Sequence, residues 1–412
     1  MKGWKGTVLC VVCALTFAVT AKADYGVKPL ATLPPGLPAS VTAPRVDLPV
    51  RLFPFEARAR SLTQGAFAGE AIAVSGSVAA GLFGRADALW FVDLETSIYS
   101  LVYETRRGMQ IQSPVWCEGH LYWVETYEDQ PAGWRIRSWE RNMGQTGLVR
   151  TDPYPESAIA PMLTVENGRV YWYESGERLS PSASSYQQIE AELFAFAPPN
   201  GEQRALMRLK TQRDWKAPCV VNGMLYAGIF DRDRWWIVAY ELQGGAERMR
   251  VALDGMPIGI QSDGRYVAWR QVEENPFVES ANGQQELGWQ AKSEEEPDRQ
   301  AQGLPGGGLW YFDFNDMSPT PRLIDTGADT LLLLPEGIYY ISESRALCFY
   351  SFHLGWVFRL SGHADYLPVL YAADARGEVL AFRAIETGEQ VCCRAALIDV
   401  AALRVRGWPQ LD

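Results

Sequence analysis

The chain has 412 residues, a net charge of −11 and an aromatic content of 12%. Nucleic acids and anionic membrane surfaces both require a basic face on a protein partner, so the acidic balance argues against both classes of partner. The length is sufficient for two ordinary domains or for one large all-β domain.

The first 23 residues are predicted to be a signal peptide. Lys2 and Lys5 precede an apolar run at 8–19, and Ala21-Lys22-Ala23 places small residues where a signal peptidase reads them. We therefore expect cleavage before Asp24, with a retained N-terminal anchor as the alternative. No later stretch is apolar for long enough to span a bilayer. Since cleavage removes three lysines and no acid, the net charge becomes −14. We expect an exported protein, either periplasmic or extracellular.

Residues 24–64 form a proline-rich segment that includes Leu33-Pro34-Pro35-Gly36-Leu37-Pro38. Proline lacks a backbone donor and restricts the residue before it, so such a run cannot join the interior of a sheet. We interpret it as an extended leader that lies on the folded body, or as a flexible tether.

One hairpin pattern recurs along the rest of the chain. It consists of a short strand opened by proline, a tight turn at glycine, and a second strand rich in aromatic residues. The copies turn at Gly119, Gly168, Gly223, Gly264, Gly337 and Gly377. A weaker first unit consists of four apolar runs at 71–75, 78–83, 88–93 and 98–103.

The spacing between these glycines predicts the architecture. Successive intervals are 49, 55, 41, 73 and 40 residues, and the outlier contains a polar stretch at about 273–308. We interpret that stretch as an insertion between the second and third strands of the fifth unit. Repeats of about 40–50 residues with four short strands are typical of propeller blades. The inner strands are apolar almost throughout, as expected of strands that neighbouring blades cover on both faces. The sequence therefore predicts an all-β propeller over 65–412 with about seven four-stranded blades; six and eight remain alternatives.

Two of the hairpins carry a family resemblance. The Gly-x-Leu-Tyr-Trp core at 119–123 and the Gly-x-Val-Tyr-Trp core at 168–172 resemble the second strands of YWTD-type and TolB-like β-propellers. Where YWTD repeats carry Thr-Asp, this chain has Val124-Glu125 and Tyr173-Glu174. The resemblance covers 65–408 as architecture. It implies a propeller fold and a general capacity to bind proteins or envelope polymers, and it transfers no functional residue.

Catalytic and metal-binding patterns are absent from the sequence. The three histidines, His120, His353 and His363, have no metal-ligand spacing, and there is no nucleophile elbow or phosphate-binding loop. Asp231-Arg232-Asp233-Arg234 has alternating acids that would suit calcium, but the interleaved arginines favour a solvated, salt-bridged turn. We therefore predict no catalytic residue, no metal and no cofactor.

Five cysteines remain after the predicted cleavage, and an odd number cannot all pair within the chain. Cys117, Cys219 and Cys348 lie in apolar runs, where cysteine usually behaves as a small buried hydrophobe. Cys392 and Cys393 are adjacent, so a bond between them would be strained.

Two hypotheses for function follow. The first is a non-enzymatic, exported propeller that binds a protein or cell-envelope component through a channel mouth or through the 273–308 insertion. Trp289, which lies in the insertion, is its one candidate binding residue. The second is an enzyme that acts on a carbohydrate or peptide with carboxylates at the channel mouth. We favour the first because no catalytic constellation is present.

Overall fold

The computed structural model describes most of residues 43–399. Gaps longer than two residues fall at 58–60, 78–85, 128–132, 153–159, 176–187, 213–216, 273–307, 343–345 and 362–377. The described elements are 28 strands. Among the described residues, no helix has the length and apolar character needed to cross a bilayer.

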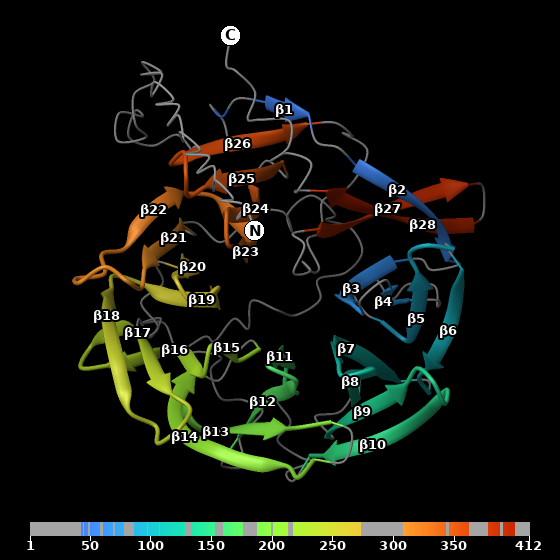
Figure 1. The fold of residues 1–412 in the computed structure, drawn as a ribbon, viewed down its shortest axis with the longest axis horizontal. Coiled ribbons are helices and arrows are strands. Elements are labelled where there is room, and N and C mark those ends of the chain that lie inside the picture. The colour runs from blue at the N-terminus through green and yellow to red at the C-terminus, as the bar shows by residue number, and fades with distance from the viewer. Residues whose placement is uncertain are drawn as a thin grey trace, which may run out of the picture.

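Six four-stranded antiparallel sheets form the blades of a propeller, and they follow one another around a ring (Figure 1). This confirms the predicted all-β propeller and gives six four-stranded blades, within the predicted range. Blades 1 to 3 are β3 (Ser61–Phe67), β4 (Ala71–Ser77), β5 (Ala88–Asp93) and β6 (Tyr99–Glu104); β7 (Met109–Cys117), β8 (His120–Tyr127), β9 (Trp134–Glu140) and β10 (Gln145–Thr151); and β11 (Thr164–Glu166), β12 (Arg169–Ser175), β13 (Gln188–Phe196) and β14 (Arg204–Gln212). Blades 4 to 6 are β15 (Cys219–Val221), β16 (Met224–Asp231), β17 (Arg234–Glu241) and β18 (Glu247–Leu253); β19 (Met256–Ser262), β20 (Tyr266–Val272), β21 (Gly308–Asp313) and β22 (Arg322–Asp325); and β23 (Ala328–Leu334), β24 (Gly337–Ser342), β25 (Leu347–Ser351) and β26 (Trp356–Ser361).

The two ends of the described chain meet in a further sheet of three strands. β2 (Val50–Ala57) pairs antiparallel with β28 (Gln390–Asp399), which pairs with β27 (Glu378–Thr387). In Figure 1 this sheet lies between blade 6 and blade 1. β1 (Arg45–Asp47) pairs in parallel with β26. Both β1 and β2 fall within the proline-rich segment and both are edge strands, which suits residues that cannot join a sheet interior.

The start of the propeller differs in detail from the repeat read in the sequence. β4, β5 and β6 correspond to three of the four predicted runs of the first unit, whereas the run at 78–83 lies outside the described residues. The first strand of blade 1 is instead β3, which begins at Ser61. No proline and no aromatic-rich second strand mark this hairpin, so the pattern that identified the other blades does not find it. The predicted domain boundaries remain predictions.

The core lies between the blades. Within β8, Leu121 and Trp123 pack with residues of blade 1, while Tyr122 and Val124 pack with residues of blade 3. Alternate side chains of a strand point to opposite faces, so a strand covered on both sides must be apolar at every position. The same arrangement joins blades 3 and 4, 4 and 5, and 5 and 6. This confirms the reason given for the apolar inner strands.

The first two strands of several blades are joined by two-residue turns with both central residues at positive φ. The pairs are Glu118-Gly119, Asn167-Gly168 and Asn222-Gly223, with φ values of 48° and 81°, 49° and 69°, and 52° and 75°. This is the type I′ geometry, whose twist matches that of paired strands. At Gly119, Gly168 and Gly223 the predicted glycine turns are therefore positions where the backbone requires glycine, whereas the predicted turn at Gly377 lies outside the described residues.

All first and third connections of the blades lie at one end of the propeller, which we call the turn face. Antiparallel pairing places them there, and backbone bonds join the two connections within a blade. The bonds run from Arg141 N to Gly119 O (3.4 Å), Leu242 N to Gly223 O (2.9 Å), Phe314 N to Arg265 O (2.6 Å) and Phe352 N to Glu336 O (3.0 Å). The second connections lie at the opposite end, the loop face. The predicted insertion lies between β20 and β21, whose ends at Val272 and Gly308 are at the loop face; residues 273–307 themselves lie outside the described residues.

The outer strands of blades 1 to 5 share a β-bulge. Each has one extra residue relative to its third strand, and these residues are Val102, Val149, Leu206, Arg248 and Ile324. The outer strand of blade 6, β26, has no such irregularity and is the one to which β1 pairs. Bulges disturb an edge and discourage further pairing, so the regular edge is also the edge that the chain covers.

Candidate functional site at the turn face

Acidic residues occupy the inner turns of four blades on the turn face. They are Glu118 in blade 2, Glu166 in blade 3, Asp263 in blade 5 and Glu336 in blade 6, and we call them the acidic rim. The first strand is the innermost strand of each blade in Figure 1, so its turn lies closest to the axis of the ring. At the turn position of Glu118, blades 3 and 4 have neutral amides, Asn167 and Asn222, and the acid of blade 3, Glu166, is the last residue of β11.

Successive inner turns contact one another. The carboxylate of Glu118 lies over the turn of blade 3, where a Cβ added at Gly168 would be 3.0 Å from its Oε1. The Glu166 carboxylate accepts a hydrogen bond of 2.9 Å from the backbone N of Asn222. The side chain of Asn222 in turn lies against Gly264 of blade 5. The inner turns of blades 2 to 5 therefore support one another in series, which holds Glu118 and Glu166 in position.

Asp263 shapes its own turn. Its Oδ1 accepts hydrogen bonds from the backbone N of Arg265 at 2.8 Å and of Tyr266 at 2.7 Å. This Asx-type arrangement replaces the type I′ turn of the earlier blades and leaves Gly264 at a φ of 92°. The carboxylate is therefore held by the backbone.

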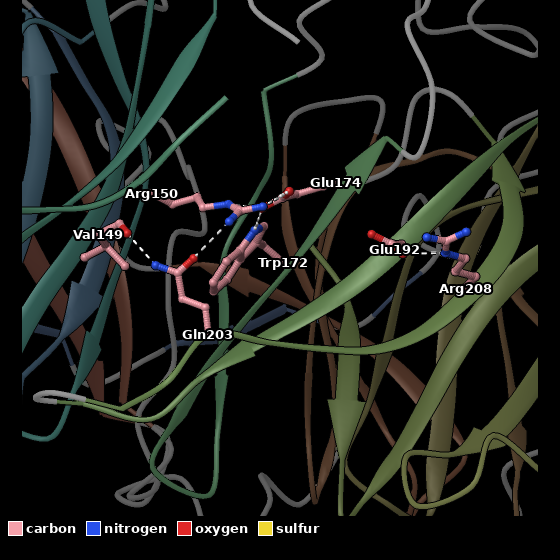
Figure 2. Close-up of polar contacts among 7 residues, drawn as sticks. All are labelled: Val149, Arg150, Trp172, Glu174, Glu192, Gln203 and Arg208. Carbon is pink, nitrogen blue, oxygen red and sulfur yellow. Dashed lines mark hydrogen bonds and ion pairs between the residues drawn. The ribbon is translucent and has the colours of Figure 1, made fainter. Parts of the chain in front are cut away.

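The acids of the Tyr-Trp-x-Glu stretches are buried between blades. Glu174 is bound by Arg150 of the preceding blade through two hydrogen bonds, at 2.9 Å to Oε1 and 2.7 Å to Oε2, as Figure 2 shows. Trp172 Nε1 donates to the same carboxylate at 2.7 Å, and Gln203 links Arg150 to the Val149 carbonyl. With every polar contact directed inward, Glu174 joins blade 2 to blade 3.

Two other junctions repeat this arrangement. Glu125 accepts from Tyr103 of the preceding blade at 2.5 Å and from Arg137 of its own blade. Burial, together with the hydrogen bond to Glu125, raises the pKa of Tyr103 to about 12. At the junction of blades 5 and 6, Tyr340 donates to Asp325 of the preceding blade at 2.7 Å. In all three, the outer strand of one blade contacts the second strand of the next.

Polar side chains also join the innermost strands. Gln64 accepts from the backbone N of Ser113, whose hydroxyl accepts at 2.7 Å from the backbone N of Leu163, so blades 1, 2 and 3 are linked. Gln261 bonds to blade 6, donating to the Leu331 carbonyl at 2.9 Å and accepting from the Leu333 N at 2.8 Å. β7 and β19 are bulged at these positions, which turns the side chains toward the neighbouring blade.

The other residues singled out in the sequence do not gather into a site. His120 Nδ1 donates to the Glu118 carbonyl at 2.9 Å, and its Nε2 lies 3.7 Å from Glu140. Asp231 pairs with Arg250 at 2.9 Å, and Arg234 pairs with Asp254 at 3.0 Å, which makes this hairpin a salt-bridged turn. Within the described part of the chain, no group of three or more His, Cys, Asp or Glu residues is placed to hold a metal ion.

The described cysteines are thiols in apolar surroundings. Cys117 and Cys348 are buried, and Cys219 is partly buried. Burial raises the pKa of the Cys117 thiol to about 11 and those of Cys219 and Cys348 to about 12. Such thiols are poor nucleophiles because the thiolate form is disfavoured.

Three predicted features stay untested. Trp289 and His363 lie outside the described residues. The backbones of Cys392 and Cys393 lie on β28 opposite Ile385 and Ala384, and their side chains are outside the described part of the structure.

The acidic rim was not identified from the sequence, although a signal was present: an acid stands beside the hairpin glycine or the Asn-Gly pair in several repeats.

The blades and their junctions define a six-bladed β-propeller. No protein-family model matches the sequence, and no curated protein matches it. Among solved structures, the crystal structure of a nidogen/laminin complex is similar. That match has 12% sequence identity and a TM-score of 0.38, and it covers 67% of this chain and 91% of that chain. The assignment to the β-propellers rests on the sheets of this chain itself.

The contact between neighbouring inner turns predicts different effects for two glycine substitutions. Gly264 and Gly244 have φ values of 92° and 93°, so Gly264→Ala and Gly244→Ala should each cost about 1–2 kcal/mol of backbone strain. Only at Gly264 would the new Cβ overlap the Asn222 side chain; nothing lies within 4 Å at Gly244. We expect a larger loss of unfolding free energy for Gly264→Ala, measured by denaturant titration. In an Asn222→Gly background the difference should disappear; its persistence would show that the contact is not responsible.

The buried ion pair of Glu174 predicts a second contrast. Glu174→Gln removes the charge that neutralises Arg150, whose side chain is 30% exposed, so we expect destabilisation of about 2–3 kcal/mol. Glu192→Gln, in the same blade, breaks the pair with Arg208, which is 74% exposed, and should cost about 0–1 kcal/mol. Both pairs appear in Figure 2. Denaturant midpoints at constant slope measure both effects, and equal losses would contradict the assigned role of Glu174.

Proposed function

We propose that the protein is an exported, non-enzymatic β-propeller that binds a protein or a component of the cell envelope at its turn face. The observation that carries this proposal is the acidic rim: Glu118, Glu166, Asp263 and Glu336 stand on consecutive or near-consecutive inner turns. Because neighbouring turns support each other, the charges are held in place before a partner arrives. Pre-organised groups of this kind lose less entropy on binding.

The charge of the rim specifies the partner. The chain carries a net charge of −11, so the rim adds a local concentration of negative charge to an acidic protein. A partner with basic side chains would be attracted over a distance and oriented toward the axis. Such complementarity increases the association rate and weakens as salt is added.

Apolar side chains on the outer turns of the same face would add contact area. Met143, Met317 and Leu354 stand on the third connections of blades 2, 5 and 6, with exposed fractions of 61%, 106% and 37%. A charged centre with apolar contacts around it can both orient and hold a protein partner. Glu125 and Glu174 stay outside this surface because they are buried between blades.

Export predicts a defined mature terminus. Expressed in a bacterial host, the protein should appear outside the cytoplasm. Its intact mass should be that of a chain whose first residue is Asp24, since Ala21 and Ala23 mark the cleavage site. Ala23→Glu places a charge at the cleavage position and should leave the precursor uncut. Recovery of a full-length cytoplasmic protein from the unaltered sequence would remove export from the proposal.

Binding at the turn face predicts loss of partners when the rim is neutralised. The triple variant Glu118→Gln/Glu166→Gln/Glu336→Gln keeps the size of each side chain, and it spares Asp263 because that carboxylate shapes its turn. Proteins and polymers retained by the unaltered protein from envelope extract at about 50 mM NaCl should be lost with this variant, and released by about 300 mM NaCl.

The matched control is a deletion of residues 275–305, which connect two strand ends at the loop face. This deletion should keep the retained partners if the turn face binds them. Partners that survive rim neutralisation but disappear with the deletion would move the binding function to the insertion and overturn the turn-face assignment. Denaturant midpoints confirm that both variants are folded.

A further inference from the structure

The outer edges of blades 1 and 2 carry most of the exposed large apolar side chains found on the outer strands. Leu101 on β6 is 53% exposed and Leu148 on β10 is 60% exposed. Tyr99, on β6, and Ile98, just before it, are 44% and 68% exposed. Six of the nine large hydrophobic residues that are exposed in the described chain fall between residues 98 and 148. Exposed apolar side chains that gather in one place usually mark a contact surface.

Comparison of equivalent positions shows how unusual β6 is. Each of the five bulged outer strands has a residue immediately before its bulge. Leu101 holds this position in β6, and the equivalent residues of the other strands are Leu148, Ala205, Glu247 and Leu323. The other bulged outer strands carry charge around this position, as with Arg204, Arg208 and Lys210 on β14, Arg248 and Arg250 on β18, and Arg322 on β22. On β10 the single charge is Arg150, which is directed inward to Glu174. β6 has only Glu104, at its end. Charges on an edge strand discourage pairing with another chain, and β6 lacks them.

The backbone of β6 is arranged to accept another strand. β6 is the last strand of its sheet, and it runs regularly from Tyr99 to Leu101 before the bulge at Val102. Asp93 N donates to the Ile98 carbonyl, so by alternation Ser100 also bonds inward and the backbone of Leu101 is directed outward. A regular stretch of this length is enough in this fold, because β1 adds to β26 through three residues.

We propose that the occupant is a second copy of this chain, with the two β6 strands paired antiparallel about a two-fold axis at Ser100. Each Tyr99 then lies opposite Leu101 of the partner, an aromatic–aliphatic pair that stabilises sheets, and Glu104 lies opposite Thr96. No like charges meet. At the position equivalent to Ser100, the same operation on β14 places Arg204 opposite its own copy. Self-pairing is thus compatible with β6 and opposed by charge at β14.

Salt dependence separates this contact from binding at the turn face. Two copies of a chain with a net charge of −11 repel each other, while the paired strands themselves are neutral over residues 98–103. Added salt screens the repulsion, so self-association should strengthen as the salt concentration rises. Binding of a basic partner at the acidic rim has the opposite dependence.

The variant Leu101→Lys tests the contact, with Leu323→Lys as the matched control at the equivalent position of blade 5, where the side chain is 43% exposed. Sedimentation velocity over a range of protein concentrations should show a reversible dimer that is tighter at about 500 mM than at about 50 mM NaCl. Leu101→Lys should raise the dimer dissociation constant at least about tenfold, since it places unpaired charge in the seam; Leu323→Lys should leave it unchanged. A monomer at every concentration, or equal effects of the two variants, would overturn the proposal.

A second variant tests the register. Ser100 faces itself across the proposed axis at the spacing of a directly opposed pair in an antiparallel sheet, which a disulfide can bridge. Ser100→Cys should therefore form a covalent dimer under mild oxidation, whereas Ala246→Cys, the equivalent position before β18, should not. A crosslink from both variants or from neither would reject this register. The rim-neutralised variant should dimerise normally, which keeps this result independent of the proposed partner binding.

Discussion

The fold depends on the second strand of each blade being covered from both sides. β8 illustrates the constraint: its odd-numbered apolar side chains belong to the core with blade 1, and its even-numbered ones to the core with blade 3. A strand in this position has no solvent-facing side on which to place a polar group, so the carboxylate of Glu125 is neutralised by side chains from two blades. Glu174 shows the same solution with Arg150 and Trp172. Apolar packing and the buried carboxylates therefore act at the same junctions, and together they determine how each blade is placed against the next.

The packing between blades fixes the positions of the inner turns. Once neighbouring blades are fixed, their first turns lie close enough for Glu118 to reach the turn at Gly168 and for Glu166 to reach the backbone of Asn222. The type I′ geometry at these turns keeps each hairpin short, so the acids stand close to the strand ends and lose little conformational entropy. A rim of fixed charge is thus a consequence of blade packing combined with the choice of acidic residues at the turns. The residues that define the fold are separate from those proposed for function, but the fold residues hold the functional ones in place.

The sequence was most informative where local geometry demands a residue type. The glycine turns at Gly119, Gly168 and Gly223 were predicted because positive φ excludes most other residues, and the aromatic second strands because they are buried on both faces. The bulges were not predictable, because one extra residue in a paired strand leaves no mark in its composition. The pairing of β2 with β28 was also hidden, since it joins segments more than 300 residues apart. The burial of Glu174 against Arg150 was also not predictable, because the two residues come from different blades.

The outer edges of the blades decide whether one copy of such a propeller can pair with another. The outer strand of a blade is an edge with which another strand could pair, and three devices limit such pairing here: the bulges of blades 1 to 5, the charges of β14, β18 and β22, and the cover that β1 gives to β26. β6 has the bulge but lacks the charges, and its apolar residues lie on the side of the bulge where the strand is regular. The overall negative charge would act differently on the two proposed contacts: it would attract a basic partner to the acidic rim and oppose the meeting of two β6 edges. Ionic strength would therefore set which of the two contacts dominates.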